Sequence, residues 1–203
     1  NTYGFLGYPV LMTSDILIYK ADRVPVGEDQ EPHLELAREI VRRFNYLYTP
    51  VFPEPEGIHT KVKVLPGVDG RKMSKSYGNL IEISATPETI RQKVGVMVTD
   101  PARVRKSDPG HPDVCNVYAF YKAFGEKQLE EVREACEKGL IGCVECKKNL
   151  AKLIIEKTKP IREKRKALEN NPKLIDDVLE DGAMRATKIA EQTLEEVRSA
   201  MKI

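Results

Sequence analysis

Residues 22–30 read Asp-Arg-Val-Pro-Val-Gly-Glu-Asp-Gln and place a short, valine-containing strand directly before a turn. Apolar residues then recur at helical spacing over residues 31–48, so the turn leads into a helix. In an open α/β sheet, ligands bind at the carboxyl ends of the strands, and backbone N–H groups at a helix start can face a ribose or a phosphate. We therefore expect the turn at 27–30 to form part of a binding site.

Upstream of this strand, residues 10–19 read Val-Leu-Met-Thr-Ser-Asp-Ile-Leu-Ile-Tyr, a mostly apolar segment that predicts a helix. Asp15 is its single acid. A carboxylate on an apolar face is costly unless it has a partner. Asp15 is therefore either an acceptor that faces a ligand or an ordinary exposed aspartate.

A second candidate site is the stretch Lys72-Met73-Ser74-Lys75-Ser76, to which a predicted strand at 61–65 leads. Glycines at 67, 70 and 78 surround it and favour a loop that can open and close. Its two ammonium groups can stabilise negative charge that develops on phosphates in a transition state, and its serines can hydrogen-bond phosphate oxygens. Short Lys/Ser runs also occur in solvated turns, so the alternative is an ordinary basic turn.

Together these segments resemble the second half of the catalytic domain of the tryptophanyl-tRNA synthetases, which are class I aminoacyl-tRNA synthetases. The resemblance rests on Tyr8-Pro9-x-Leu11-Met12-x-x-Asp15-Ile16-Leu17, on Val24-Pro25-Val26-Gly27-Glu28-Asp29-Gln30 and on Lys72 to Ser76. It covers nearly the whole chain. It implies activation of tryptophan with ATP and Mg2+ to tryptophanyl-adenylate, transfer to tRNA(Trp), and a homodimer in the full-length protein.

The resemblance also implies a role for each matching residue. Lys72 and Lys75 would be the catalytic cations. The ATP-binding residues would be Gly27, Glu28, Asp29, Val64, Lys72, Met73, Ser74, Lys75 and Ser76. The tryptophan-binding residues would be Tyr8, Met12, Asp15, Val24, Val26 and Gln30. Asp15 would accept the indole N–H, and a wrong side chain would leave that acceptor unpaired.

The related tyrosyl-tRNA synthetases are the nearest alternative. They usually carry glutamine three positions before the specificity aspartate and Gly-x-Ser-Asp-Gln at the strand end, where this chain has Met12 and Gly27-Glu28-Asp29-Gln30. Both differences favour tryptophan. One departure from many tryptophanyl enzymes follows the loop, where Tyr77-Gly78-Asn79 stands in place of Asp-Pro-Asn and leaves the details of the loop open.

The other half of the class I signature, His-x-Gly-His, does not occur in this sequence, whose histidines His33, His59 and His111 are isolated. We therefore expect the chain to be the C-terminal part of a longer protein and to be catalytically silent by itself. A rival from another functional class is a non-catalytic tRNA-binding module with a structural metal.

The character of the sequence changes near residue 84. Before it, strands and helices alternate, which predicts the second half of a Rossmann-type catalytic domain over residues 1–84. Beyond it every segment reads as helical, and Thr86-Pro87 and Asn171-Pro172 are typical helix starts. The resemblance implies that residues 85–203 form a helical domain that binds the tRNA anticodon. The predicted fold class is thus α/β followed by all-α.

Composition and charge narrow the function further. The net charge is +2, from 33 basic and 31 acidic residues, and says little about nucleic acid. Residues 143–168 nevertheless hold nine basic and three acidic residues, so this segment either neutralises RNA phosphates or is a solvated helix face. A hydrophobic content of 41% excludes wholesale disorder, and no apolar run reaches the length of a membrane span. We expect a cytoplasmic protein.

All four cysteines lie within 32 residues of the predicted helical region, at Cys115, Cys136, Cys143 and Cys146. Persistent disulfides are rare in the cytosol, so the grouping predicts metal ligation. A four-thiolate 4Fe-4S cluster tolerates wide spacing, whereas zinc usually takes two close pairs and only Cys143/Cys146 is one. A branch of bacterial tryptophanyl-tRNA synthetases that bears a 4Fe-4S cluster has a similar pattern. Zinc is the second interpretation, and ordinary buried cysteine is the third.

Overall fold

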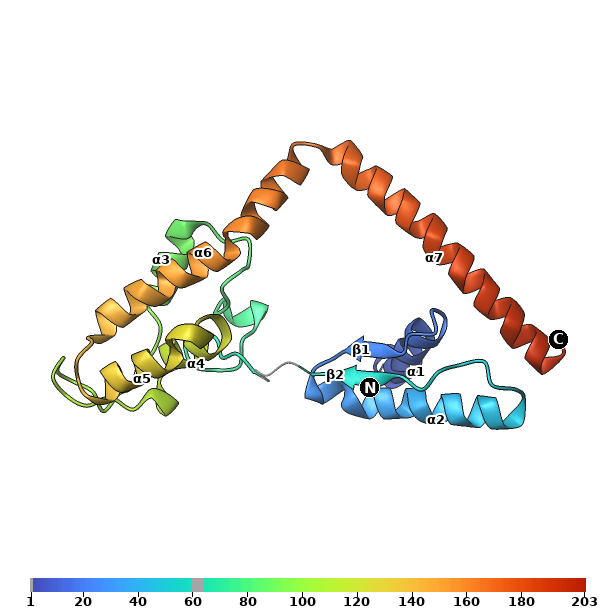
Figure 1. The fold of residues 1–203 in the computed structure, drawn as a ribbon, viewed down its shortest axis with the longest axis horizontal. Helices are drawn as coiled ribbons and strands as arrows, with labels where there is room; N and C mark the ends of the chain where they lie inside the picture. Colours follow the sequence, from blue (N-terminus) through green and yellow to red (C-terminus); the bar gives the residue numbers. More distant parts are fainter. Residues whose placement is uncertain (1, 60–63) are drawn as a thin grey trace. The chain divides into compact units, whose positions relative to one another are not determined.

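The computed structural model describes residues 2–59 and 64–203, and these form two compact units (Figure 1). One unit comprises the described part of Asn1–Lys63 together with Lys173–Ile203, and the other comprises Val64–Pro172. The turn at 27–30 belongs to the first unit. The loop at 72–76 and all four cysteines belong to the second. The functional domain boundary expected near residue 84 falls inside the second unit and stays a prediction.

A β–α–β segment forms the centre of the first unit. Strands β1 (Arg23–Pro25) and β2 (Glu56–Ile58) pair in parallel, with Val24 opposite Gly57. Helix α2 (Glu31–Leu47) lies between them in the sequence. The apolar cluster of this unit joins α2 to α1 (Tyr3–Leu17) through the buried side chains of Ile16, Leu17, Leu34 and Val41. The strand before the turn and the helix after it are therefore confirmed.

The strand that was expected at 61–65 lies largely outside the described residues. A strand was predicted at 61–65, but residues 60–63 lie outside the described part of the chain, and Val64 and Leu65 are not in a strand. The strand that pairs with β1 is β2, at 56–58. Gly57 lets β2 lie close to α2, because a Cβ at this position would stand 2.9 Å from Glu31 Oε2 and 3.2 Å from Leu34 Cδ2.

Helix α1 begins earlier than its apolar run predicted. It starts at Tyr3, behind the capping residue Thr2, and continues through Pro9. A proline inside a helix cannot donate to the preceding turn, which is why the sequence suggested a start after it. Thr13 Oγ1 donates to Pro9 O at 2.9 Å within this helix. Burial is confined to the later turns, at Thr13, Ile16 and Leu17.

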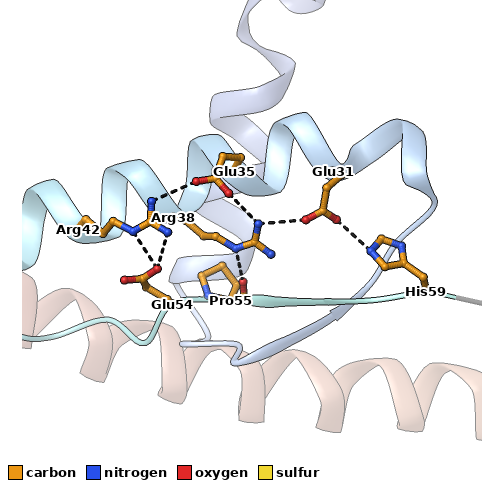
Figure 2. Close-up of polar contacts among 7 residues, drawn as sticks. All are labelled: Glu31, Glu35, Arg38, Arg42, Glu54, Pro55 and His59. Atoms are coloured by element: carbon orange, nitrogen blue, oxygen red, sulfur yellow. Dashed lines mark hydrogen bonds and ion pairs between the residues drawn. The ribbon is translucent and has the colours of Figure 1, made fainter.

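A polar network joins α2 to the chain that leads into β2 (Figure 2). Its members are Glu31, Glu35, Arg38, Arg42, Glu54, Pro55 and His59. Arg38 Nε donates to Pro55 O at 2.9 Å, and Arg42 Nε donates to Glu54 Oε2 at 2.9 Å. The Arg38 side chain is 18% exposed and the Arg42 side chain 51%. The Arg38 bonds are therefore better shielded from water.

The second unit is built on four helices, which Figure 1 shows grouped together. They are α3 (Pro87–Gly95), α4 (Asn116–Phe124), α5 (Leu129–Glu137) and α6 (Cys143–Glu169). Helix α6 packs against α3 and α4, around a core that includes Ile90, Val94, Met97, Val117, Phe120, Leu150 and Ile154. Thr86 Oγ1 accepts the N–H of Thr89 at 3.2 Å, which confirms the predicted start of α3.

Helix α7 (Pro172–Met201) follows α6 and is grouped with the first unit. Its start at Pro172 confirms the Asn171-Pro172 signal. Lys20 Nζ pairs with Glu196 Oε2 of this helix at 2.5 Å. Over residues 2–59 and 64–203, no helix combines the length and the apolar character that a membrane crossing requires. The fold is thus a small parallel sheet followed by helices, as the sequence predicted.

Candidate active site

The loop that carries residues 72–76 is closed at its base. Pro66 and Lys72 form an antiparallel bridge, and Gly67 N donates to Arg71 O at 2.8 Å. Asp69 accepts the backbone N–H of Arg71 at 3.0 Å and pairs with its guanidinium at 2.7 Å. These contacts fix the point at which the chain enters the motif.

A single 3₁₀ turn, Lys75–Tyr77, forms the tip of the loop. Ser74 Oγ accepts the N–H of Ser76 at 3.2 Å, so one acceptor position of this hydroxyl is already used. Gly78 ends the turn with φ at +63°, and its N–H donates to Lys75 O at 3.1 Å. Proline cannot adopt a positive φ. The departure from Asp-Pro-Asn at these positions therefore has a local structural reason, because this turn requires glycine at 78.

The side chains of the motif divide between the core and the solvent. Met73 packs against the apolar core of the second unit. Lys72 and Lys75, on either side of it, are exposed. A partly buried methionine thus packs the loop against the core while two ammonium groups face the solvent, where a polyphosphate could meet them. The roles of Lys72 and Lys75 toward ATP stay predictions.

Sequence reasoning missed Asn79, which is buried with 3% exposure. Its Oδ1 accepts the N–H of Ser74 at 2.8 Å, and its Nδ2 donates to Lys72 O at 3.2 Å. Nδ2 also donates to Asp69 Oδ1 at 2.8 Å. This hydrogen bond, followed by those from Arg71, holds the pKa of the Asp69 carboxyl below its ordinary value. The position of Asn79 just after the motif was the available signal.

The turn at 27–30 lies where the sequence placed it, between β1 and α2. Glu28–Gln30 form a 3₁₀ turn behind Gly27. A Cβ on Gly27 would stand 2.6 Å from Asp29 Oδ1, so this carboxylate lies against the glycine backbone. Gln30 Nε2 donates to Asp29 Oδ2 at 3.2 Å. The turn therefore presents a carboxylate and an amide at the N-terminus of α2, and their roles toward ATP stay predictions.

The residues predicted to bind tryptophan all belong to the first unit, but they are not equally placed. Met12, Val24 and Val26 pack against the same apolar cluster. The Tyr8 ring contacts His33 edge to face, with centroids 5.7 Å apart.

Asp15 is exposed on α1, so the desolvation cost expected for its carboxylate does not arise in this unit. Gln30 is half-buried. Val64, predicted to lie along ATP, is 74% exposed in the other unit.

Each cysteine lies at or next to the end of a helix. Cys115 directly precedes α4, Cys136 is in the last turn of α5, and Cys143 and Cys146 are in the first turn of α6. All four thiols are partly exposed. Burial raises the pKa of Cys146 to about 12, and repulsion by the other three thiolates adds to the shift. All four cysteines therefore lie at ends of helices of the second unit.

Arg103 supplies positive charge beside these sulfurs. Its Nη1 donates to Cys136 Sγ at 3.7 Å and its Nη2 to Ile141 O at 2.7 Å, while its Nε is buried without a partner among the described residues. A Cβ on Gly110 would stand 2.5 Å from Cys136 Sγ. Across residues 2–59 and 64–203, no three Cys, His, Asp or Glu side chains stand at metal-ligand spacing. The predicted metal centre is therefore not shown.

A buried aspartate orders the loop between α3 and α4. The side chain of Asp100 is 4% exposed, and its Oδ2 accepts the backbone N–H of His111 at 2.9 Å and lies 2.8 Å from His111 Nδ1. Its Oδ1 accepts the N–H of Ala102 at 2.9 Å. The contact with the His111 ring holds the pKa of Asp100 below its ordinary value despite burial. His111 therefore has a structural partner in Asp100.

The basic segment at 143–168 lies within α6. Lys148, Lys152 and Lys157 are exposed, and Lys147 Nζ donates to Gly95 O at 3.0 Å. A cavity of about 480 Å³ opens between α3 and α6, lined by Arg91, Gly95, Val144, Lys147, Lys148, Ala151 and Lys152. Cations around an apolar floor can receive a phosphate and a flat ring together, which is compatible with RNA.

Residues 2–158 match the family described as tRNA synthetases class I (W and Y). The fold neighbour with a TM-score of 0.79 is the tryptophanyl-tRNA synthetase from Campylobacter jejuni, solved in complex with ADP and tryptophan. It is 33% identical, and the alignment covers 100% of this chain and 63% of that one. The chain therefore belongs to the class I tRNA synthetases of the tryptophan and tyrosine group.

Within that group, curated relatives of high identity are tryptophan–tRNA ligases. The chain is 52% identical over 205 residues to the enzyme of Thermotoga maritima and 50% identical over 205 residues to that of Aquifex aeolicus. Each alignment covers 100% of this chain, but only 62% and 52% of the respective relative. The chain thus spans between half and two thirds of the length of these relatives.

Proposed function

We propose that the complete protein activates tryptophan with ATP to tryptophanyl-adenylate and transfers it to tRNA(Trp). The observation that carries this proposal is the loop in which Met73 packs against the core while Lys72 and Lys75 face the solvent. The relatives support the proposal, because about half of the residues of this chain are identical to those of two tryptophan–tRNA ligases.

In the proposed reaction, the carboxylate of tryptophan attacks the α-phosphate of ATP and pyrophosphate leaves. Negative charge grows on the leaving group, so ammonium groups at Lys72 and Lys75 stabilise the transition state more than the ground state. The reaction needs no covalent nucleophile, because positioning and charge stabilisation suffice. Mg2+ enters with ATP and neutralises phosphate charge. The turn at 27–30 would lie along the nucleotide.

Tryptophan would be held by the first unit. Met12, Val24 and Val26 supply an apolar wall, and Asp15 on α1 supplies the acceptor for the indole N–H. Tyr8 and Gln30 would hold the ammonium and carboxylate end. The tyrosine-specific alternative is not favoured, because the curated relatives named above are tryptophan enzymes.

We assign the binding of tRNA to the helical region beyond residue 84. The supporting observation is the row of exposed lysines on α6 beside the cavity between α3 and α6. Lysines that neutralise RNA phosphates make affinity fall steeply with salt. Binding of tRNA(Trp) that does not depend on salt would contradict this assignment.

We further propose that the four cysteines hold a 4Fe-4S cluster, with zinc as the alternative metal. Four partly exposed cysteines at the ends of α4, α5 and α6 and the guanidinium of Arg103 beside Cys136 suit an anionic metal centre. Ligation would draw the thiols closer than they now stand. Bound, the centre would pin the ends of α4, α5 and α6.

Iron and acid-labile sulfide in anaerobically prepared protein, with a broad visible band that Cys143→Ser abolishes, would support the cluster. Colourless protein with one zinc would establish the alternative. Four freely alkylated thiols and no metal would refute both.

The activity is tested by ATP–pyrophosphate exchange on the complete protein with each amino acid in turn. Exchange that requires tryptophan, with tyrosine giving none, is the expected result. Exchange with tyrosine would establish the tyrosyl alternative. Binding of tRNA without exchange for any amino acid would favour the non-catalytic module.

A further inference from the structure

Two asparagines join the motif loop to the helical core of the second unit. Asn79 is the inner one, with 3% exposure. It contacts the backbone on both sides of Met73, because Oδ1 accepts the N–H of Ser74 at 2.8 Å and Nδ2 donates to Lys72 O at 3.2 Å. Its own carbonyl accepts the N–H of Val68 at 2.8 Å. One side chain therefore sets the separation of the two peptide groups that flank the anchoring methionine.

Gly67 connects this asparagine to the next. The Asn79 side chain lies so close to Gly67 that a Cβ there would collide with its amide group. On its other side, Gly67 O accepts Nδ2 of Asn116 at 2.6 Å. Asn116 is the first residue of α4 and is 7% exposed. The loop base is thus held between the buried Asn79 and the start of a core helix.

The amide of Asn116 has a single described contact. Its Oδ1 is buried without a hydrogen-bond partner among the described residues, so Nδ2 and Gly67 O form the bond that fixes the side chain. Hydrogen bonds between buried polar groups are costly to break, because the group that is left behind cannot form a hydrogen bond to water instead. The loop base therefore cannot shift without disturbing the first turn of α4.

We propose that Asn79 and Asn116 are positioning residues for Lys72 and Lys75: Asn79 fixes the loop backbone, and Asn116 ties that backbone to α4 through Gly67. The contribution to catalysis rests on the proposed function, whereas the contribution to loop order does not. A lysine that is displaced by about 1 Å from a developing charge can lose about a hundredfold in rate. The asparagines would therefore act on the rate and not on the affinity for tryptophan.

Loop order is tested first, by hydrogen exchange on the 203-residue chain. Asn116→Asp keeps the shape but removes the donor to Gly67 O, and Asn79→Ala removes the loop bonds. Asn149→Asp on the exposed face of α6 is the matched control. Hydrogen exchange over residues 72–79 should rise at least tenfold in Asn116→Asp and in Asn79→Ala, while hydrogen exchange in α3 and α6 stays unchanged. Unchanged exchange over 72–79, or an equal rise through the helices, would overturn the proposal.

Catalysis is tested in the complete protein by ATP–pyrophosphate exchange. Asn116→Asp should lower kcat by about 10- to 100-fold and leave the KM for tryptophan within about twofold. A rise in KM with kcat unchanged would overturn the positioning role. If the native protein shows no exchange with tryptophan, the proposed function fails, and the hydrogen-exchange result still decides the link between the asparagines and the loop.

Discussion

The two compact units bury their apolar residues to different extents. Among the described residues, the unit at 64–172 closes a core of eleven buried residues on and beside α3, α4 and α6, whereas the other gathers four in its cluster. In that smaller unit, Tyr3, Phe5 and Leu6 of α1 are 90%, 76% and 77% exposed. The motif loop therefore belongs to the better-packed unit, and the predicted tryptophan-binding residues belong to the other unit. Transition-state charges need fixed positions, and a closed core supplies them.

The largest expected effect is a loss of stability on emptying either core. It tests whether the two units unfold separately. Phe120→Ala should cost about 3–5 kcal/mol because it empties the core of the 64–172 unit, and Leu34→Ala should cost about 2–5 kcal/mol in the other. Hydrogen exchange should rise mainly in the unit that carries each substitution. Equal increases in both units would show that they unfold as one.

The next effect concerns recognition in the smaller unit. Asp15→Asn in the complete protein should lower kcat/KM for tryptophan by about 1–3 kcal/mol, because a neutral amide replaces the charged acceptor for the indole N–H. Glu39→Gln, on the exposed face of α2, is the control. Unchanged tryptophan kinetics in Asp15→Asn would remove this residue from the site.

A smaller effect separates two neighbouring arginines of the network in Figure 2. Arg38→Ala should cost about 1 kcal/mol, since it removes a shielded bond to Pro55 O. Arg42→Ala should cost less, because its partners are half exposed and an exposed ion pair is screened by water. Urea unfolding of the two variants gives the comparison. An equal or larger loss in Arg42→Ala would contradict the importance of shielding.

The smallest effect is a pH dependence in the 64–172 unit. The folded pKa of Asp100 is lowered, so its contribution to stability is present above the unfolded pKa of about 3.9 and is lost as the pH falls through the folded value. Asp100→Asn should therefore lower the urea midpoint near neutral pH, and the difference from the native chain should shrink below about pH 4. A difference that grows on acidification would contradict the assignment.

The sequence predicted local features well where one residue type determines the backbone. The turn after β1, the capped start of α3 and the start of α7 all lie where glycine, threonine, proline and periodicity placed them. It did not predict β2 at Glu56–Ile58, because the close approach of Gly57 to Leu34 is a tertiary contact without a local signal. It missed Asn116 for the same reason, since the bond to Gly67 spans 49 positions.

The central claim is that the loop at 72–79 acts on the phosphates of ATP. Lys75→Ala in the complete protein tests it most directly, with Arg43→Ala on the exposed face of α2 as the control of equal charge change. Tryptophan-dependent pyrophosphate exchange should fall by about 100-fold or more in kcat, because the charge that Lys75 meets develops mainly in the transition state. The KM for tryptophan should stay nearly constant. A defect confined to that KM, with kcat preserved, would contradict the account.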